Sequence, residues 1–341
     1  MKKLRWGIIG LGAVAYEFAK GFKDSKNAEL FGIASKNENK IDKFKKDFVI
    51  NKNYCFDDYE KIIENSDIDI IYIALPNIMH YEWIIKCLKK RKKVLVEKPA
   101  TINSQQIENI KKLFGLENFF ITEGFVYLYH PQIKKVLELI NQGMIGKLIS
   151  MESSFGKNLL TKKNIFGFEK KKKINVKNRL FNREMGGGAI LDLGCYPVSF
   201  STLIASQELK VDFNKVKVLD KKVKIGDTGV DIDASAELHF ENNFTSKIST
   251  SFKKNLGRKS KITGTNGELT IEDTWLAEPP KVCIIKDTKR EIEVTSDKNI
   301  YSYEINSISQ LLLGLIDETS FQGLIIDDTI GNMKILDKWK N

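Results

Sequence analysis

The first 124 residues alternate short apolar runs with segments of helical period. Such runs are typical of buried parallel strands, and the segments between them place apolar side chains on one face of a helix. Repeated strand–helix–strand units favour a parallel sheet with right-handed crossovers. The N-terminal part is therefore predicted to be α/β, with a doubly wound sheet. Strands are expected near 4–9, 29–34, 68–74, 94–96 and 119–122, and helices near 13–23, 78–90 and 104–114.

The pattern changes after residue 125. Pro131 opens a helix that runs to about residue 141, and Gly143 and Gly146 follow its end. A mostly strand-like region then continues, interrupted by a loop-rich segment at 156–188 and a helix at 190–205. Strands are expected at 147–154, 215–224, 230–240, 244–252, 259–263 and 282–285, with hairpin turns at Asn242-Asn243 and Asn266-Gly267.

Two amphipathic segments, near 301–316 and 325–339, close the chain. The pattern predicts a second α/β domain over residues 125–341, in which helices back a large, open, mostly antiparallel sheet. Such a sheet leaves its other face in need of a partner. We therefore expect a homo-oligomer, either a homodimer or a homotetramer.

The segment Gly10-Leu11-Gly12-Ala13-Val14-Ala15 is a GxGxxA sequence directly after the first strand and directly before a helix. The first glycine permits a tight turn, the second lets the backbone approach a pyrophosphate, and the small Ala15 lets helix and strand pack closely. The helix N-terminus offers its N–H groups to the phosphates. This context predicts a Rossmann dinucleotide-binding domain over residues 1–124, with Gly10, Gly12, Ala13 and Val14 at the cofactor.

The end of the second strand distinguishes two nicotinamide cofactors. A carboxylate there binds the ribose 2′-hydroxyl of NAD, but this strand ends in Ile33-Ala34-Ser35-Lys36, with no acid before Glu38. A hydroxyl and a cation suit the 2′-phosphate of NADP. We predict that NADP is preferred over NAD and that Ser35 and Lys36 contact it. The alternative is that both are ordinary loop residues.

The tripeptide Glu97-Lys98-Pro99 follows the apolar run Val94-Leu95-Val96. Lys98 therefore stands where a buried strand emerges at its carboxyl end, the edge at which doubly wound sheets bind ligands. Pro99 stops the strand and restricts the backbone of Lys98. A lysine in this place suits an anionic or proton-exchanging partner. The alternative is a lysine that caps a strand end and faces solvent.

A second cluster is Gly186-Gly187-Gly188-Ala189-Ile190-Leu191-Asp192-Leu193-Gly194-Cys195-Tyr196-Pro197. Three glycines suggest a flexible loop whose backbone touches a ligand. Asp192 and Tyr196 are four residues apart, so they share one face of a helix. A carboxylate and a phenol on one face can form hydrogen bonds with a hydroxylated substrate. The phenol can also transfer a proton, provided that a cation such as Lys98 lowers its pKa. The alternative is that Asp192 favours a helix N-terminus and Tyr196 is a half-buried core residue.

The composition of the chain argues against a disulfide-bonded, metal-binding, membrane-spanning or nucleic-acid-binding protein. The chain has 341 residues, a formal net charge of +11 and four cysteines without a CxxC pair, which suits reduced thiols in a cytoplasm. Only three histidines occur, none in HExxH, so a metal is not expected. No apolar run is long enough to span a bilayer, and the lysine run at 170–173 lacks the interleaved aromatic residues of a nucleic-acid groove. We expect no membrane and no nucleic-acid partner.

Taken in order, the GxGxxA opening, Glu97-Lys98-Pro99 and the Gly186–Tyr196 cluster resemble the Gfo/Idh/MocA family of NAD(P)-dependent oxidoreductases. Two further stretches agree: Leu75-Pro76-Asn77-Ile78-Met79-His80, and Glu123-Gly124-Phe125 leading to Tyr129-His130-Pro131. The Asp-x-Gly-x-Tyr form is similar to the branch that holds glucose–fructose oxidoreductase, aldose dehydrogenases and trans-dihydrodiol dehydrogenases. The resemblance covers nearly the whole chain.

The resemblance implies a Rossmann domain followed by an α/β domain with a large open sheet used for oligomerisation. It implies that Lys98 and Tyr196 form the catalytic pair, with Asp192 and His80 nearby. It also implies a sugar, sugar derivative or cyclic diol as the substrate. By the same resemblance Leu75, Pro76, Asn77, His80, Glu97 and Lys98 line the cofactor, and Tyr127 joins Lys98, Asp192 and Tyr196 at the substrate.

Leu128 departs from this branch, in which many relatives carry Arg at that position, and an apolar residue there weakens any transfer of substrate identity. Two alternatives stay open. A regulatory protein that senses cofactor or sugar on the same fold would be expected to lose Lys98 or Tyr196, whereas this chain keeps both. An enzyme that reduces a biliverdin-like or imine substrate would not need the polar trio of Lys98, Asp192 and Tyr196.

Overall fold

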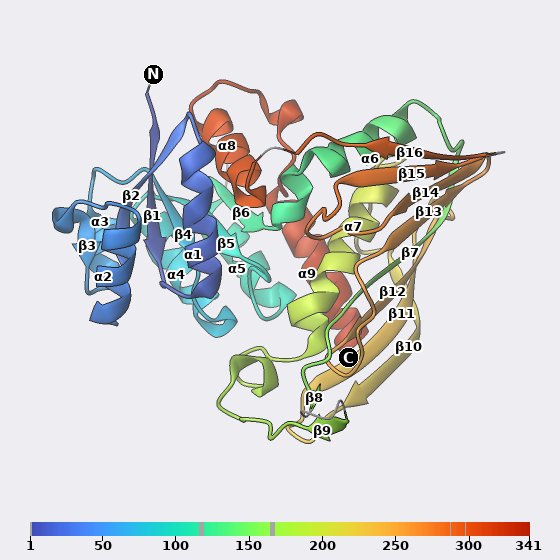
Figure 1. The fold of residues 1–341 in the computed structure, drawn as a ribbon, viewed down its shortest axis with the longest axis horizontal. Coiled ribbons are helices and arrows are strands. Elements are labelled where there is room, and N and C mark those ends of the chain that lie inside the picture. The colour runs from blue at the N-terminus through green and yellow to red at the C-terminus, as the bar shows by residue number, and fades with distance from the viewer. Residues whose placement is uncertain (1, 116–118, 164–167, 287, 297) are drawn as a thin grey trace. The chain divides into compact units, whose positions relative to one another are not determined.

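The computed structural model of the chain describes residues 2–115, 119–163, 168–286, 288–296 and 298–341 (Figure 1). These residues form two compact units. As far as their residues are described, the first unit comprises Met1–Thr101, Gln105–His130 and Asp297–Thr329, and the second comprises Ile102–Ser104, Pro131–Ser296 and Ile330–Asn341. We predicted a dinucleotide-binding domain over residues 1–124 and a substrate-binding domain over residues 125–341. This functional assignment stays a prediction, and the first compact unit also includes a later stretch that ends at Thr329.

A parallel sheet forms the centre of the first unit. Within the described residues its strand order is β3-β2-β1-β4-β5-β6, and every neighbouring pair is parallel. The order reverses between β1 and β4, where doubly wound sheets bind their ligands. The predicted α/β sheet is confirmed, although the short β3 was missed because two residues show no period. The strands are β1 (Leu4–Ile9), β2 (Ala28–Ala34), β3 (Cys55–Phe56), β4 (Ile70–Ile73), β5 (Lys93–Glu97) and β6 (Ile121–Gly124).

Helices surround this sheet, and one of them comes from far along the chain. Helix α8 (Ile300–Leu312) packs against α1 and the 3₁₀ turn η1 that follows it. The Trp6 indole N–H donates to Ser309 Oγ over 3.0 Å, and Ser302 Oγ donates to Gly21 O over 2.9 Å. The α-helices that precede β6 are α1 (Ala13–Lys20), α2 (Glu38–Asp47), α3 (Tyr59–Glu64), α4 (Asn77–Lys89) and α5 (Ser104–Phe114), and η1 spans Gly21–Asp24. Of these, α2 and α3 were not predicted.

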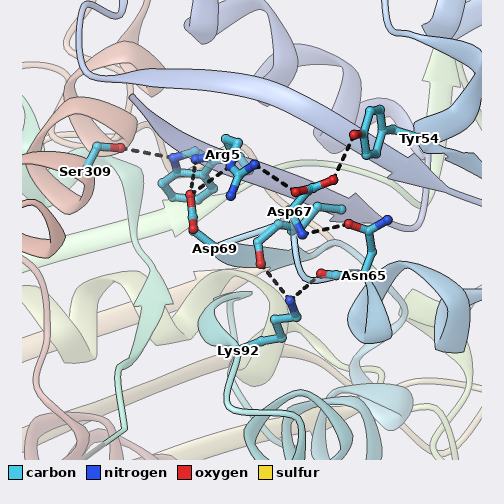
Figure 2. Close-up of polar contacts among 9 residues, drawn as sticks. Arg5, Tyr54, Asn65, Asp67, Asp69, Lys92 and Ser309 are labelled. Atoms are coloured by element: carbon cyan, nitrogen blue, oxygen red, sulfur yellow. Dashed lines mark hydrogen bonds and ion pairs between the residues drawn. The ribbon is translucent and has the colours of Figure 1, made fainter. Parts of the chain in front are cut away.

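A polar network ties the strands together at their amino-terminal ends (Figure 2). Arg5 of β1 forms an ion pair with Asp67 at 3.2 Å. Lys92, just before β5, donates to Asn65 O over 2.6 Å and to Ile68 O over 2.7 Å. Burial lowers the pKa of this lysine, and the two carbonyl oxygens replace its hydration. The network lies at the sheet edge opposite Lys98, so it holds the scaffold rather than the candidate site.

A larger mixed sheet forms the second unit. Its order is β10-β11-β12-β7-β13-β14-β15-β16 within the described residues, and only β12 and β7 pair in parallel. The predicted mostly antiparallel sheet is confirmed. Its strands are β7 (Leu148–Gly156), β10 (Lys217–Ile225), β11 (Asp231–His239), β12 (Thr245–Ser251), β13 (Ser260–Gly264), β14 (Gly267–Ile271), β15 (Lys281–Ile285) and β16 (Lys289–Glu293), of which β14 and β16 were not predicted.

One face of this sheet is covered by helices, as Figure 1 shows for α6 (Pro131–Asn141), α7 (Cys195–Ala205) and α9 (Ile326–Lys340). The other face carries charged side chains, with ion pairs such as Lys261 to Glu268 at 2.7 Å and Lys254 to Asp233 at 3.0 Å. The strands also expose apolar side chains, among them Ile149 of β7 and Leu219 of β10. The homodimer or homotetramer stays a prediction.

The loop-rich segment at 156–188 contains a short hairpin of β8 (Thr161–Lys163) and β9 (Glu169–Lys171), while its residues 164–167 lie outside the described part of the chain. Both predicted hairpin turns are present, between β11 and β12 and between β13 and β14. Among the described helices, none is long and apolar enough to cross a lipid bilayer.

Candidate active site

The predicted pyrophosphate loop joins β1 to α1. Gly10 has a φ of +88°, and a Cβ on it would lie 2.5 Å from Ala74 O, so only glycine fits between the ends of β1 and β4. A Cβ on Gly12 would meet no atom within 4 Å, and Gly12 gives α1 no side-chain cap. The first turn of α1 thus presents backbone N–H groups toward open space and contains no acidic residue. Gly10, Gly12, Ala13 and Val14 fit a bound pyrophosphate.

The end of β2 is shaped by a short turn. Ser35 is buried, and its Oγ accepts from Asn37 N over 3.2 Å, while Asn37 caps α2. Lys36 is exposed, with its ammonium group 5.9 Å from the centre of the Tyr59 ring. No carboxylate occupies positions 35–37. A cation and a hydroxyl at this sheet edge fit a phosphate better than a ribose hydroxyl.

The turn that follows β5 carries Lys98, which is half-buried. His80 of α4 is fully buried between two carbonyl oxygens: Nδ1 lies 2.9 Å from Pro99 O and Nε2 lies 2.8 Å from Leu75 O. A neutral imidazole donates one hydrogen bond, whereas an imidazolium donates two. His80 therefore connects the loop after β4 with the turn after β5, and its contact with the cofactor stays a prediction.

Acidic side chains gather beneath that turn. Glu97, at the end of β5, accepts a short hydrogen bond from the Tyr72 hydroxyl. Glu304 of α8 is 1% exposed, and its burial together with the charge of Glu97 raises its pKa well above the usual range. Burial also raises the pKa of Glu123 in β6 to about 7, against the opposing effects of the Ala100 N–H, the Thr329 hydroxyl and the Lys98 charge. The sequence patterns did not show this set of acids as a group, because its members come from three separate segments.

In the second unit, the segment before α7 departs from the regular helix that we expected. Residues Ile190–Gly194 form a π-helical turn, and α7 begins only at Cys195. The π turn contains Asp192, and such turns are frequent at functional sites. The Asp231 carboxylate in β11 accepts from Ile190 N over 2.6 Å and so caps the start of this helix. Asp231 was missed because it lies 41 residues further along the chain.

The glycine loop before this helix is closely packed, and the flexible ligand contact that we expected stays a prediction. A Cβ on Gly187 would lie 2.6 Å from Arg179 O, and a Cβ on Gly188 would lie 2.2 Å from an Asp231 carboxylate oxygen. The loop thereby holds the turn at Arg179 against the helix. The Arg179 guanidinium reaches Asp192 at 3.4 Å. Arg179 is a charged neighbour that the sequence patterns did not single out.

Aromatic rings hold Tyr196 in place. Its ring packs edge-on against Phe155, with centroids 5.2 Å apart, and lies tilted 5.5 Å from Trp275. Trp275 is itself fixed, because its indole N–H donates to Ser154 O over 3.0 Å. Tyr196 is half-buried, so both the core interpretation and the catalytic one fit its burial.

The two units divide the predicted site residues between them. The cofactor set from Gly10 to Lys98 lies in the first unit, at the carboxyl ends of β1, β2, β4 and β5. Tyr127 also lies there and is fully buried, as is its neighbour Leu128 at 1% exposure. Asp192 and Tyr196 lie in the second unit. The pairing of Lys98 with Tyr196 therefore stays a prediction.

Sequence comparisons bear directly on both units. A profile described as the oxidoreductase family with an NAD-binding Rossmann fold matches residues 4–123, and the GFO/IDH/MocA C-terminal domain matches residues 133–270. The chain belongs to the GFO/IDH/MocA oxidoreductase family. This confirms the resemblance, the α/β fold class and a nicotinamide cofactor. It also supports an NAD(P)-dependent oxidoreductase.

Individual relatives are named as dehydrogenases and reductases. The trans-1,2-dihydrobenzene-1,2-diol dehydrogenase of Xenopus tropicalis is 25% identical over 340 residues, covering 96% of this chain and 95% of its own. A dTDP-3,4-didehydro-2,6-dideoxy-alpha-D-glucose 3-reductase of Actinomadura kijaniata is 28% identical over 208 residues, covering 61% and 58%.

Solved structures share the fold. A 3-ketoreductase from Actinomadura kijaniata, in complex with NADP and TDP-benzene, has a TM-score of 0.81 at 21% identity, covering 98% of this chain and 96% of its own. The aldose-aldose oxidoreductase from Caulobacter crescentus, complexed with glycerol, has a TM-score of 0.83 at 17% identity, with the same coverage.

Proposed function

We propose that this protein transfers hydride between NADP, in preference to NAD, and a hydroxyl or carbonyl carbon of a sugar, a sugar derivative or a cyclic diol. One observation carries the proposal: a lysine follows the end of β5 at the same sheet edge as the glycine loop after β1, where a Cβ on Gly12 would meet no atom within 4 Å. The absence of an acid at 35–37 and the NADP of the Actinomadura kijaniata structure support the cofactor preference. The named activities of the relatives support the substrate class.

In this proposal the glycine loop at Gly10 and Gly12 would hold a nicotinamide cofactor, which would supply the hydride exchange. Tyr196 takes the hydroxyl proton in the oxidative direction, and Lys98 polarises the reacting oxygen. A phenol with a usual pKa of about 10 needs a nearby cation to accept a proton near neutrality, and Lys98 supplies that charge. Asp192, paired with Arg179, orients a neighbouring substrate hydroxyl.

A substrate panel and two variants test the proposal. Aldoses, inositols and diols are offered with NADP and with NAD, and turnover is read at the nicotinamide absorbance band. With any substrate so found, Lys98→Met and Tyr196→Phe should each lower kcat by at least about a hundredfold, the lower end of what positioned acid–base groups contribute. NADP affinity should stay near the wild-type value.

Matched controls lie away from the site. Lys89→Met changes an exposed lysine at the other end of α4, and Tyr54→Phe removes a hydroxyl that donates to Asp67 in the network of Figure 2. Both controls should keep wild-type kcat. Near-full turnover by Lys98→Met and Tyr196→Phe would show that the assigned roles are wrong.

A further inference from the structure

The turn after β5 is held from two sides by buried ionisable side chains. His80 contacts Pro99 O at 2.9 Å, and Glu123 Oε1 accepts from Ala100 N over 2.9 Å. Pro99 and Ala100 are buried, with Ala100 only 1% exposed. The two residues after Lys98 therefore have little freedom, and the origin of the lysine side chain is fixed with them.

The position of Glu123 follows from the register of β6 on β5. Glu123 pairs with Val96, and Gly124 pairs with Glu97. A Cβ on Gly124 would lie 3.2 Å from Val96 O, so glycine lets the two strands stay close at this edge. Glu123 is 2% exposed, and its carboxyl group reaches past the end of β5 to the Ala100 N–H. A hydrogen bond from a backbone N–H to a buried carboxylate is stronger than a neutral one.

The surroundings of Glu123 act on the pKa of its carboxyl group in opposite directions. Burial raises its pKa to about 7, and the charge of Glu97 acts in the same direction, while the Ala100 N–H, the Thr329 hydroxyl and the Lys98 ammonium group oppose it. Its other oxygen, Oε2, is buried and makes no hydrogen bond of good geometry within the described residues, although the Thr329 hydroxyl lies near. The turn that carries Lys98 is thus attached to a group that ionises near neutral pH.

We propose that Glu123 is a positioning residue for Lys98: by accepting the Ala100 N–H, it fixes the turn after β5 and so the direction of the lysine ammonium group. The proposal rests on the proposed function in one respect, namely that Lys98 is the reactive lysine. Glu123 acts through the turn, and His80 supports the same turn at the preceding residue.

Two variants of Glu123 separate its hydrogen bond from its charge. Glu123→Leu removes the acceptor and leaves the buried Ala100 N–H unpaired. Glu123→Gln keeps a carbonyl oxygen for that N–H and removes the ionisation. We expect Glu123→Leu to lower kcat at least about tenfold with little change in KM for NADP. A misplaced Lys98 would stabilise the transition state less, and a loss of about 1.4 kcal/mol in that stabilisation corresponds to a tenfold lower rate. Glu123→Gln should recover most of kcat and lose the step near pH 7 from the kcat profile.

A second readout does not depend on turnover. Competitive acetylation of the whole protein with acetic anhydride, followed by mass spectrometry of the Lys98 peptide, reports the reactivity of that amine. Glu123→Leu releases the turn that fixes Lys98, so Lys98 should acetylate faster in this variant than in wild type. Glu123→Gln keeps the acceptor for Ala100 N and should stay close to the wild-type rate, and Lys89 should be unchanged in both variants. This measurement gives an answer even if no substrate is found and the proposed function fails.

The matched control is Thr122→Val. Thr122 is the preceding residue of β6, is 2% exposed, and its hydroxyl donates to Leu324 O over 3.0 Å. The substitution removes a buried hydrogen bond from the same strand without touching the Lys98 turn. It should lower the melting temperature and leave kcat and Lys98 acetylation unchanged. The proposal is overturned if Glu123→Leu folds and keeps wild-type kcat, if Lys98 acetylation is the same in Glu123→Leu as in wild type, or if Thr122→Val matches Glu123→Leu in both readouts.

Discussion

At the scale of single residues, cofactor choice depends on the end of β2. Ser35 is held by the Asn37 N–H, and Lys36 lies in solvent beside Tyr59. Neither contact neutralises the ammonium group, so its charge is available to a ligand. A phosphate on the cofactor ribose would gain a charge-assisted hydrogen bond there, and a plain ribose hydroxyl would gain little.

We therefore predict that Lys36→Ser raises KM for NADP about tenfold and leaves KM for NAD nearly unchanged, because a hydrogen bond to a charged group contributes about 1.5 kcal/mol or more. Initial rates with both cofactors measure this. Lys89→Ser, at an exposed position on α4, is the control and should change neither constant. An equal rise for both cofactors in Lys36→Ser would contradict a contact with the 2′-phosphate.

At the scale of elements, the helix that carries Asp192 and Tyr196 depends on its first residues. Asp231 caps the helix at Ile190, and Gly188 makes room for the Asp231 carboxylate with a φ of +119°. Burial raises the pKa of Asp231, while the backbone N–H groups of Ala189 and Ile190 favour its charged form. The Asp231 cap therefore depends on a glycine at position 188, because a side chain there would clash with the Asp231 carboxylate.

Gly188→Ala should destabilise the protein by more than about 1 kcal/mol from backbone strain alone, with a further loss from the clash with Asp231. Denaturant unfolding measures the change. Gly143→Ala is a matched control, because Gly143 has a φ of +68° but a Cβ there would meet no atom within 4 Å. If both variants lost the same stability, the close approach to Asp231 would have no energetic role.

At the scale of the whole molecule, the nucleotide-binding unit is completed by a segment from near the C-terminus. Helix α8 places Ile305 and Ile308, both fully buried, in this unit and accepts the Trp6 indole hydrogen bond at Ser309. Each such apolar side chain contributes about 1.5–3 kcal/mol when buried. The N-terminal sheet by itself therefore lacks part of its core.

A fragment of residues 1–130 should consequently unfold without a cooperative transition and should not bind NADP, although it contains the whole glycine loop. Circular dichroism and cofactor fluorescence test this. The full chain with Ser309→Ala is the mild control and should bind NADP with a melting temperature only slightly reduced, because it loses one buried hydrogen bond. Wild-type NADP affinity in the fragment would show that α8 is dispensable.

The sequence by itself determined the features that have a short period or a local motif. The alternation of apolar runs and helical segments predicted both sheets, and Gly10 and Gly12 were recognisable because their neighbours in the chain define a strand–turn–helix unit. Lys98 was found for the same reason, since the strand before it is visible in Val94–Val96. Elements with little periodic signal, such as the two-residue β3 and the mostly polar β16, were missed.

Only the tertiary structure decided which distant residues support those motifs. Asp231 caps the helix of Asp192, Glu123 holds the turn after Lys98, and α8 joins the first unit. No period or spacing connects such partners, because their contacts arise when strand register and packing bring segments far apart in the chain together. The sequence therefore indicated the candidate site residues, and the tertiary structure determined which distant residues hold them in position.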